Sequence, residues 1–433
     1  MIYISAARTI LVAAALAAFS NVCAKQPRRR RSAGDFSFAP QSNSSDFALG
    51  LSFEWTSTTN ASTSQLIGLK RRDPPTKSRV SLQLKKNEMG NLWVAPVQIG
   101  TPRIRDPDPR TPHAPAHTTH TQTLDILFST VSDISWVGSC PQFKNTYTPL
   151  DSSSARFIEK SFYLDEMDKN PTENLRAHTY SDVVNVAELE TRLEFGVVSN
   201  ARRLDPKAQD GIFSLSRFTD LPSEHPRQNF FESEFLEPKT KPSNIFAFNM
   251  PGNYAEIRFG RSNVQGIEYH FARKRSRFWE IGVPGSVIVG ESIWSTHIIN
   301  ARIDSGTYLI YGPHDEITSV YKHVGIEPNL DPKGYYTFSC GHKFTADVHF
   351  TWKRNSFLTV SRNDFIYSRK DQICTGIFKG NPVAIQSKQW ILGQSFIKGK
   401  LVELDGVQNR IGFREAIPLH VPKQTSMQGE DSE

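Results

Sequence analysis

Short runs of hydrophobic and aromatic residues recur between residues 92 and 413, and Gly, Pro and Asn separate them. Runs of this length and spacing predict β-strands. The clearest runs cover residues 92–99, 124–128, 244–248, 255–259, 286–289 and 357–360. Helical periodicity is scarce, and its best example is His314 to Val324, which has acidic residues early and a lysine late. The pattern predicts a mostly β protein with large sheets and few helices.

Residues 103–121 interrupt this pattern with a proline-rich stretch. Because proline lacks the N–H donor of a sheet ladder, the stretch should not join a sheet and should form an exposed loop. It contains His113, His117 and His120, but it offers no acidic or cysteine partner beside them for a metal. We therefore expect neither a metal site nor a cofactor.

The N-terminus has the pattern of a secretory signal over residues 1–24. Arg8 supplies the positive charge, residues 10–19 the apolar stretch, and residues 22–24 (VCA) a small-residue cleavage site. A mitochondrial peptide or a short anchor is the alternative, although the apolar run is too short to span a membrane. The signal favours a secreted protein, either extracellular or within the secretory or vacuolar pathway.

Two polybasic clusters follow the signal, at residues 28–31 and 70–72. They suit processing by secretory convertases, and they are equally compatible with a solvated run of charge. We interpret residues 25–72 as a propeptide and expect the mature chain to start near Asp73. The polar tail, residues 417–433, carries no hydrophobic anchor signal.

The composition excludes two classes of partner. The 433 residues include 51 Lys and Arg against 44 Asp and Glu, a formal net charge of +7. The basic residues are scattered rather than clustered with aromatics, so we expect no nucleic-acid partner. No apolar run of 18 residues occurs after the N-terminus, so we expect no integral membrane segment.

Cysteines support secretion only modestly. Removal of a signal that contains Cys23 leaves Cys140, Cys340 and Cys374, an odd number that leaves one thiol over. A bond between the last two would close a 34-residue loop and stabilise the fold by roughly 3–4 kcal/mol in the chain-entropy model.

Two short motifs repeat at matching spacing. Residues 128–132 (FSTVS) and 303–307 (IDSGT) both follow an apolar run and share the order apolar, short polar, Ser or Thr, small, Ser or Thr. The string IFS ends 85 residues after Ser129, and the string ILG ends 89 residues after Asp304. Matching motifs at matching spacing predict two similar lobes related by a pseudo-twofold axis.

These motifs resemble those of the pepsin-like aspartic peptidases. That family places an Asp-Thr/Ser-Gly-Thr/Ser loop in each lobe, and each loop passes under an apolar-apolar-Gly segment. Residues 301–307 (ARIDSGT) are the most specific match. Further matches are residues 99–102 (IGTP), 132–137 (SDISWV), 178–182 (HTYSD), 210–213 (DGIF), 278–281 (FWEI), 390–396 (WILGQSF) and 409–413 (NRIGF). The resemblance covers most of residues 90–415.

The resemblance implies a bilobal pepsin-like acid protease fold with a central cleft, formed by an N-terminal lobe at residues 73–265 and a C-terminal lobe at residues 266–416. It places Cys340 and Cys374 at the family's C-lobe disulfide. Cys140 would then keep its thiol or form an intermolecular bridge. Among the substrate-binding residues, Tyr180 would be the tyrosine of the flap, and Ser132 and Thr307 would hold the corresponding positions of the two loops.

The departures from the family concern its chemistry. The family's reaction needs two carboxylates that share one proton and hold a water between them. Asp304 supplies one carboxylate, and Ser129 stands at the position of the other. Asp125 lies roughly 13 Å from Ser129 along the strand, and Asp133 is expected to point away, so neither replaces it. Further departures are Val131, Ser181 and Ser214 at three glycine positions and Gln394 at an Asp position.

We therefore interpret the protein as a secreted, monomeric pepsin homologue that lost peptidase activity and binds peptides or proteins in the old substrate cleft. Two alternatives remain open. One is an acidic aspartic-type endopeptidase that works with Asp304, and the other is a relic without any function in the cleft.

Overall fold

The computed structural model describes residues 80–418, apart from residues 103, 106–116, 119–120, 165–174, 201–207, 218–228, 236–241, 291–293, 299, 328, 354–355 and 382–388. All described residues belong to one compact unit. The expected signal peptide, propeptide and nearly all of the polar tail lie outside the described residues, so these three segments stay predictions.

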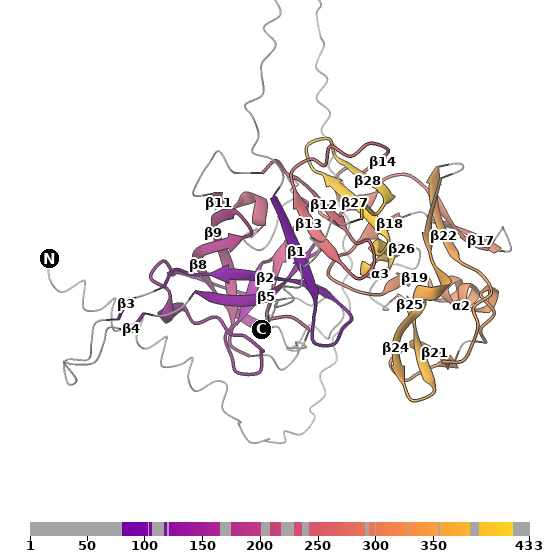
Figure 1. Cartoon of the computed structure of the whole chain (residues 1–433), viewed down its shortest axis with the longest axis horizontal. Coiled ribbons are helices and arrows are strands. Elements are labelled where there is room, and N and C mark those ends of the chain that lie inside the picture. The colour runs from indigo at the N-terminus through magenta and orange to yellow at the C-terminus, as the bar shows by residue number, and fades with distance from the viewer. Residues whose placement is uncertain are drawn as a thin grey trace, which may run out of the picture. The chain divides into compact units, whose positions relative to one another are not determined.

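Strands dominate the described residues (Figure 1). Those before residue 265 are β1 (Val80–Lys86), β2 (Trp93–Ile99), β3 (Ile104–Arg105), β4 (His117–Thr118), β5 (Gln122–Ser129), β6 (Trp136–Gly138), β7 (Arg156–Leu164), β8 (Leu175–Val186), β9 (Leu189–Val198), β10 (Gly211–Ser214), β11 (Glu234–Phe235), β12 (Ile245–Asn249) and β13 (Ala255–Phe259).

The strands after residue 265 are β14 (Glu268–Phe271), β15 (Glu280–Ile281), β16 (Gly285–Val289), β17 (Trp294–Ile298), β18 (Asn300–Ile303), β19 (Ile310–Gly312), β20 (Asn329–Leu330), β21 (Tyr335–Ser339), β22 (Val348–Lys353), β23 (Ser356–Val360), β24 (Ile366–Lys370), β25 (Ile373–Gly380), β26 (Gln389–Leu392), β27 (Lys400–Asp405) and β28 (Arg410–Glu415). The helices are α2 (His314–His323), α3 (Gln394–Ile397) and the short 3₁₀ turns η1 (Pro149–Asp151), η2 (Phe230–Glu232) and η4 (Arg362–Asp364).

The secondary structure confirms the mostly β prediction. Each of the six strands expected from the hydrophobic runs is present within one or two residues of its expected bounds, and the expected helix is α2. Helix α2 buries Ile317, Val320 and Tyr321, has acidic residues in its first turn, and ends with Lys322 and His323, as favours a helix dipole.

The strands form two large sheets and two small ones. The order of the first is β14-β28-β27-β12-β13-β1-β2-β5-β10-β6-β9-β8-β7, with β11 added to β9. The second is β15-β18-β26-β19-β25-β21-β20, with β24 added to β25, and the smaller sheets are β17-β16-β22-β23 and β3-β4. Figure 1 shows the C-terminal strands β27 and β28 beside β12 and β13. The first sheet therefore crosses the expected lobe boundary at residue 265.

A repeated strand topology supports the pseudo-twofold relation. In the first sheet the series β5-β10-β6-β9-β8 pairs parallel, antiparallel, parallel and antiparallel. In the second sheet the series β18-β26-β19-β25-β21 pairs in the same four senses. The two motifs found in the sequence end β5 and follow β18, so each stands at the same place in its own series.

Aromatic packing anchors the strand that leads to the first motif. The Phe128 ring contacts Phe213, Phe230 and Phe259 at centroid distances of 5.8–6.2 Å, all near the edge-to-face geometry that aromatic pairs prefer. Phe128 is 2% exposed. Because the side chains of a strand alternate between its two faces, burial of Phe128 turns Ser129 to the opposite face.

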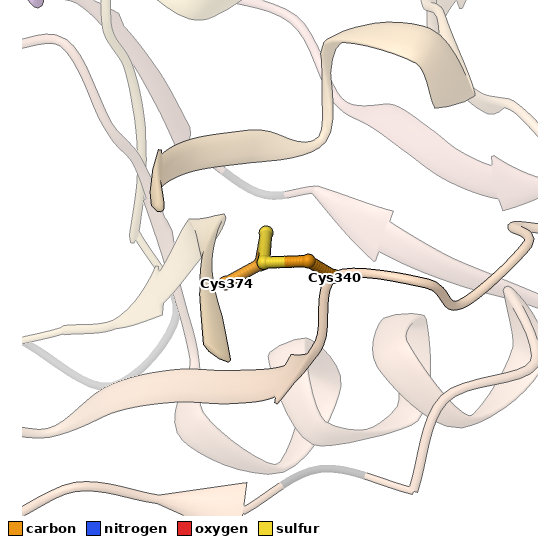
Figure 2. The surroundings of a disulfide bond; sticks show 2 residues. All are labelled: Cys340 and Cys374. Carbon is orange, nitrogen blue, oxygen red and sulfur yellow. A yellow bond between two sulfur atoms is a disulfide. The ribbon is translucent and has the colours of Figure 1, made fainter. Parts of the chain in front are cut away.

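Two expectations about individual segments can be checked. Cys340 and Cys374 are joined by a disulfide bond, which ties β25 to the residue after β21 (Figure 2). Cys140 is 1% exposed, so a partner molecule cannot reach its sulfur without local opening. The expectation that residues 103–121 join no sheet is wrong in part, because β3 and β4 pair with each other at the ends of this stretch. The prolines between these ends lie outside the described residues.

Candidate active site

Parallel strand pairs position the two motif loops, the first at residues 128–132 and the second at residues 303–307. In the first sheet Ser129 is the register partner of Ser214. In the second sheet Ile303 is the register partner of Leu392, and the Asp304 N–H donates to the Leu392 carbonyl at 3.0 Å. Each motif therefore leaves its strand beside the apolar segment that the sequence spacing had linked to it.

Reciprocal hydrogen bonds join the two loops through Thr130 and Ser305. The Thr130 N–H donates to Ser305 Oγ at 3.1 Å, and the Ser305 N–H donates to Thr130 Oγ1 at 3.0 Å. Each hydroxyl also donates to a carbonyl of the other loop, Thr130 Oγ1 to Ile303 at 2.8 Å and Ser305 Oγ to Phe128 at 2.7 Å. Both residues are fully buried. Thr130 and Ser305 are the third residues of their motifs, and this correspondence is the feature of the sequence that indicates the pairing.

Gly306 shows how closely Ser129 and Asp304 approach each other. A Cβ atom built on Gly306 would lie 2.7 Å from Ser129 Oγ and 3.0 Å from Asp304 Oδ1. A single point next to Gly306 is thus within about 3 Å of both side-chain oxygens. The structure brings the two residues singled out in the sequence into one site.

The two side chains make similar contacts within their own loops. Ser129 Oγ accepts the Ser132 N–H at 3.1 Å, and Asp304 Oδ1 accepts the Gly306 N–H at 2.7 Å. Ser129 is 2% exposed, whereas Asp304 is half-buried. Each loop therefore turns backbone N–H groups toward the position of its acid, and in the first loop a hydroxyl occupies that position.

Ser132 and Thr307 are both half-buried at the ends of their loops. Ser132 Oγ donates to the Ile134 carbonyl at 2.7 Å, and the Thr307 carbonyl accepts the Gln394 N–H at 2.8 Å. These contacts hold the loops in place. Their expected role in substrate binding stays a prediction.

Val131 does not sit in a backbone conformation reserved for glycine. Among the described residues, the non-glycine residues with positive φ are Ala187, Arg275, Asp371 and Asn409. Gly306, the counterpart of Val131, is likewise absent from the glycines with positive φ. The turn needs glycine at Gly306 for the close approach of Ser129 and Asp304, and not for its φ. The exchange of glycine for Val131 in the first loop therefore affects the space beside the turn and not its φ angle.

The apolar segments beside the two loops, residues 212–214 and 391–393, are here called the crossing segments. They differ in the space available for a side chain at their last residue. A Cβ atom on Gly393 would lie 2.2 Å from the Leu309 carbonyl oxygen and 2.7 Å from that of Thr307, so a side chain does not fit. Its counterpart Ser214 carries a side chain, and the Oγ atom donates to the Ser132 carbonyl at 2.5 Å. The first loop is therefore wider at this crossing than the second.

The Gln394 side chain links the second loop to Trp93 by hydrogen bonds. Its Oε1 atom accepts the Trp93 N–H at 2.8 Å, and its Nε2 atom donates to the Ser305 carbonyl at 2.8 Å. The side chain is 2% exposed. The amide thus satisfies one donor and one acceptor at once, which a carboxylate at this position cannot do.

Tyr180 lies away from any hairpin tip. It is in the middle of β8, opposite Phe157 of β7 and Phe195 of β9. Its ring is 7% exposed and lies 5.3 Å from the ring of Phe157, and burial raises the pKa of its hydroxyl. Both ladder partners hold Tyr180 inside the sheet, and its expected role as the tyrosine of the flap stays a prediction. Tyr163, paired with Arg176 near the β7–β8 connection, occupies a position closer to a hairpin end.

An open cavity of about 900 Å³ lies elsewhere in the molecule, beside β14, β22, β23 and β28. It is lined by Trp352, Phe413 and Lys400 among others, and neither Ser129 nor Asp304 contributes to it. Within the described ranges there is no cluster of three or more His, Cys, Asp or Glu side chains placed to hold a metal. The described helices also include none long and apolar enough to cross a membrane.

The sequence profile of the eukaryotic aspartyl proteases matches residues 118–416. The chain belongs to the pepsin-like aspartic protease family. It is 26% identical over 319 residues to pepsin-3 of Oryctolagus cuniculus, a match that covers 69% of this chain and 79% of that protein. It is 23% identical over 355 residues to pregnancy-associated glycoprotein 4 of Ovis aries, covering 77% of this chain and 83% of that protein.

Other family members match over shorter stretches. The aspartic protease of Phaffia rhodozyma is 25% identical over 249 residues, which cover 55% of this chain and 60% of that protein. Pepsin A of Suncus murinus is 28% identical over 138 residues, which cover 31% of this chain and 35% of that protein. The chain thus spans about a third to three fifths of the length of these two relatives.

Proposed function

We propose that this pepsin-like protein has lost peptidase activity and binds peptide or protein segments in the cleft expected between its lobes. The observation that carries the proposal is the pairing of Ser129 with Asp304 around Gly306. Peptide hydrolysis in this family needs one ionised and one protonated carboxyl group around a shared water. A serine hydroxyl does not ionise near neutral or acidic pH, so Ser129 cannot supply the second carboxyl group.

The intact framework around the site supports retained binding. The bonds between Thr130 and Ser305 hold both loops in register without any help from a carboxylate. A protein that lost the reaction can therefore keep the backbone that presents its cleft. We also propose that it is secreted as a monomer after removal of residues 1–24, and that residues 25–72 are its propeptide.

One observation favours the alternative, an aspartic-type endopeptidase that acts at acidic pH through Asp304. The second loop keeps the whole Asp-Ser-Gly-Thr motif, and Asp304 Oδ1 still accepts the Gly306 N–H. In this alternative another group would have to supply the second proton-transfer step.

Two assays on the processed protein separate the candidates. A quenched fluorescent peptide library, incubated between pH 3 and pH 7, should show no cleavage above that of the Asp304→Asn variant. Fluorescence anisotropy with hydrophobic peptides should show saturable binding. Cleavage that depends on pH and disappears in Asp304→Asn would establish the endopeptidase instead, and absence of both cleavage and binding would leave a relic.

A further inference from the structure

A basic turn lies next to the site, in the connection between β14 and β15. It comprises residues 273–277, in which Arg273, Lys274, Arg275 and Arg277 are all exposed. Arg275 has a φ of 61°, so the chain reverses direction sharply there. Four cations over five positions on an exposed turn form a strongly positive surface.

One contact joins the basic turn to the end of the first loop, and a second joins the next residue, Phe278, to the strand that leads to the second loop. Arg277 Nη1 lies 2.7 Å from Asp133 Oδ2, and Asp133 directly follows Ser132 at the end of the first loop. On the other side, Phe278 directly follows the turn, and the Arg302 guanidinium lies 3.6 Å from the centre of its ring. Arg302 lies in β18 and precedes Asp304 by two residues.

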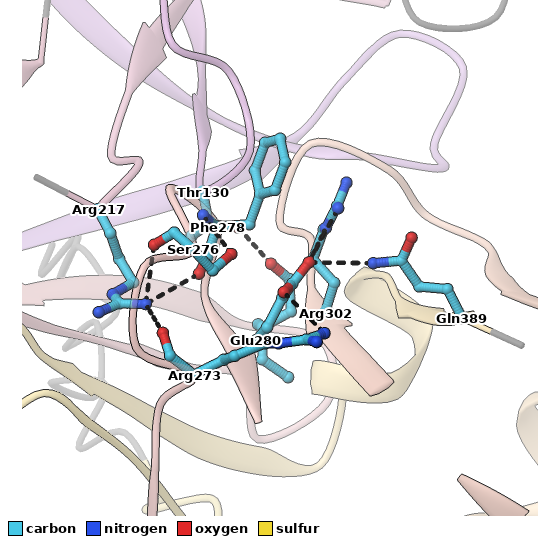
Figure 3. A network of polar contacts seen from close by, with 9 residues as sticks. Thr130, Arg217, Arg273, Ser276, Phe278, Glu280, Arg302 and Gln389 are labelled. Atoms are coloured by element: carbon cyan, nitrogen blue, oxygen red, sulfur yellow. Dashed lines mark hydrogen bonds and ion pairs between the residues drawn. The ribbon is translucent and has the colours of Figure 1, made fainter. Parts of the chain in front are cut away.

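Arg217 gives the basic turn a defined shape (Figure 3). Its Nη1 atom donates to the carbonyls of Arg273 at 2.7 Å, Ser276 at 2.9 Å and Phe278 at 3.4 Å. Its backbone N–H donates to the Arg277 carbonyl at 3.0 Å. The Arg217 guanidinium thus fixes the backbone of the basic turn, and the basic side chains of the turn remain exposed. Preorganised cations bind an anion without the entropy loss of ordering a loop.

Few carboxylates neutralise this surface. Glu280 accepts from Arg302 at 3.0 Å and from Gln389 at 3.1 Å, and Asp133 pairs with Arg277. Arg273 Nη1 also lies 4.0 Å from Glu280 Oε2, so among the described residues Glu280 and Asp133 pair with three of the cations. Lys274 and Arg275 form no ion pair with any residue that the structure describes.

We infer that the basic turn makes this protein select acidic peptide segments, with Asp or Glu side chains flanking the residues bound beside Asp304. The inference rests on the proposed peptide-binding function and adds the chemical class of the ligand. Opposite charge on the ligand is favoured because Lys274 and Arg275 have no carboxylate partner among the residues that the structure describes. A protein segment is the occupant the geometry favours, since the turn adjoins the loops that would bind a peptide backbone.

Matched peptides test the inference on the full processed protein. Three labelled peptides share one hydrophobic centre and carry two flanking Glu, Gln or Lys residues. At 50 mM NaCl we expect the Glu peptide to bind about 5- to 10-fold more tightly than the Gln peptide, and the Lys peptide to bind most weakly. The preference should largely disappear at 0.5 M NaCl, since salt screens exposed charges.

The variant Lys274→Gln/Arg275→Asn removes these two cations, and Asn tolerates the left-handed backbone of residue 275. It should bind Glu and Gln peptides within about twofold of each other while keeping the wild-type affinity for the Gln peptide. The control Lys322→Gln/Lys343→Gln removes two exposed charges outside the turn and should keep the preference.

Three results would overturn the inference. The first is equal wild-type affinity for Glu and Gln peptides, which leaves the peptide-binding proposal intact. The second is an acidic preference that survives in the turn variant but is lost in the control. The third is turn-dependent capture of heparin or DNA without any preference for the Glu peptide. If no peptide binds at all, the proposed function itself fails.

Discussion

The first and second loops have nearly the same backbone support and different chemical content. Thr130 and Ser305 exchange the same pair of hydrogen bonds, and parallel strand pairs deliver both loops to the site. The first loop carries Ser129 and Val131 where the second carries Asp304 and Gly306. The comparison teaches that hydroxyl and backbone groups hold the two loops together. The loops therefore keep their arrangement without a carboxylate at position 129, although peptide hydrolysis requires one.

The crossing segments also share their backbone pairing and differ in their side chains. Gly393 has no room for a Cβ atom, whereas Ser214 fits and bonds to the Ser132 carbonyl. A glycine can thus be lost where a neighbouring carbonyl offers the new hydroxyl a partner. The difference between the loops is therefore a set of local substitutions, each of which the fold accommodates.

The largest expected effect comes from making the first loop like the second. Ser129→Asp/Val131→Gly should raise acid peptidase activity at least about 100-fold above wild type, the low end of what positioned acid–base catalysis contributes. Cleavage rates at pH 3–5 measure this, and a transition-state-mimicking peptide should block them. Adding Asp304→Asn to the double variant should abolish the gain.

Ser129→Asp alone should recover little in the same assay. The pseudo-twofold relation directs a side chain at position 131 toward Asp304, just as a Cβ atom on Gly306 would contact Ser129. We expect the valine to reduce the space beside Asp304 that the shared water needs. Equal activity of the single and double variants would show that Val131 does not obstruct the site.

The next largest effect is on stability. Thr130→Val removes a buried hydroxyl and leaves the Ser305 N–H and the Ile303 carbonyl without it, which should cost about 2–4 kcal/mol of unfolding free energy. Urea denaturation of Thr130→Val, Ser305→Ala and the double variant should give a coupling energy of about 1–2 kcal/mol. The control Thr318→Val changes a half-buried threonine on α2 whose hydroxyl also makes hydrogen bonds, and it should cost less, about 1 kcal/mol. Additive losses would mean that the two loops are stabilised independently.

A smaller effect is expected from exchanging the crossing residues. Gly393→Ser should destabilise by about 1–3 kcal/mol, because the new Cβ atom would meet two backbone carbonyls. Ser214→Gly should cost only about 1 kcal/mol, from one lost hydrogen bond and greater chain entropy in the unfolded state. Urea midpoints compare the two variants. The reverse order would show that the first crossing is the tighter one.

The smallest effect should follow Ser129→Ala. The change removes the acceptor of the Ser132 N–H from a site that is otherwise supported, so the loss should be about 0.5–1.5 kcal/mol. Peptide affinity, measured by anisotropy, should stay within about twofold of wild type. A much larger loss of affinity would mean that the hydroxyl contacts the ligand.

By itself, the sequence determined the mostly β class, all six of the strands singled out, helix α2 and the pairing of each motif with its apolar segment. Strand periodicity and turn residues are local properties, so they can be predicted without the fold. The residues Ser129 and Asp304 could also be found, because each stands at a fixed place in a repeated motif.

Only the tertiary structure decided how these elements meet. The β27 and β28 strands share a sheet with β12 and β13, and Thr130 bonds to Ser305 across 175 residues of sequence. The place of Tyr180 in the middle of β8, between two partner strands, also follows from strand pairing and not from a local string. The contact between the basic turn and Asp133 likewise exists only in the folded chain, because long-range packing brings them together.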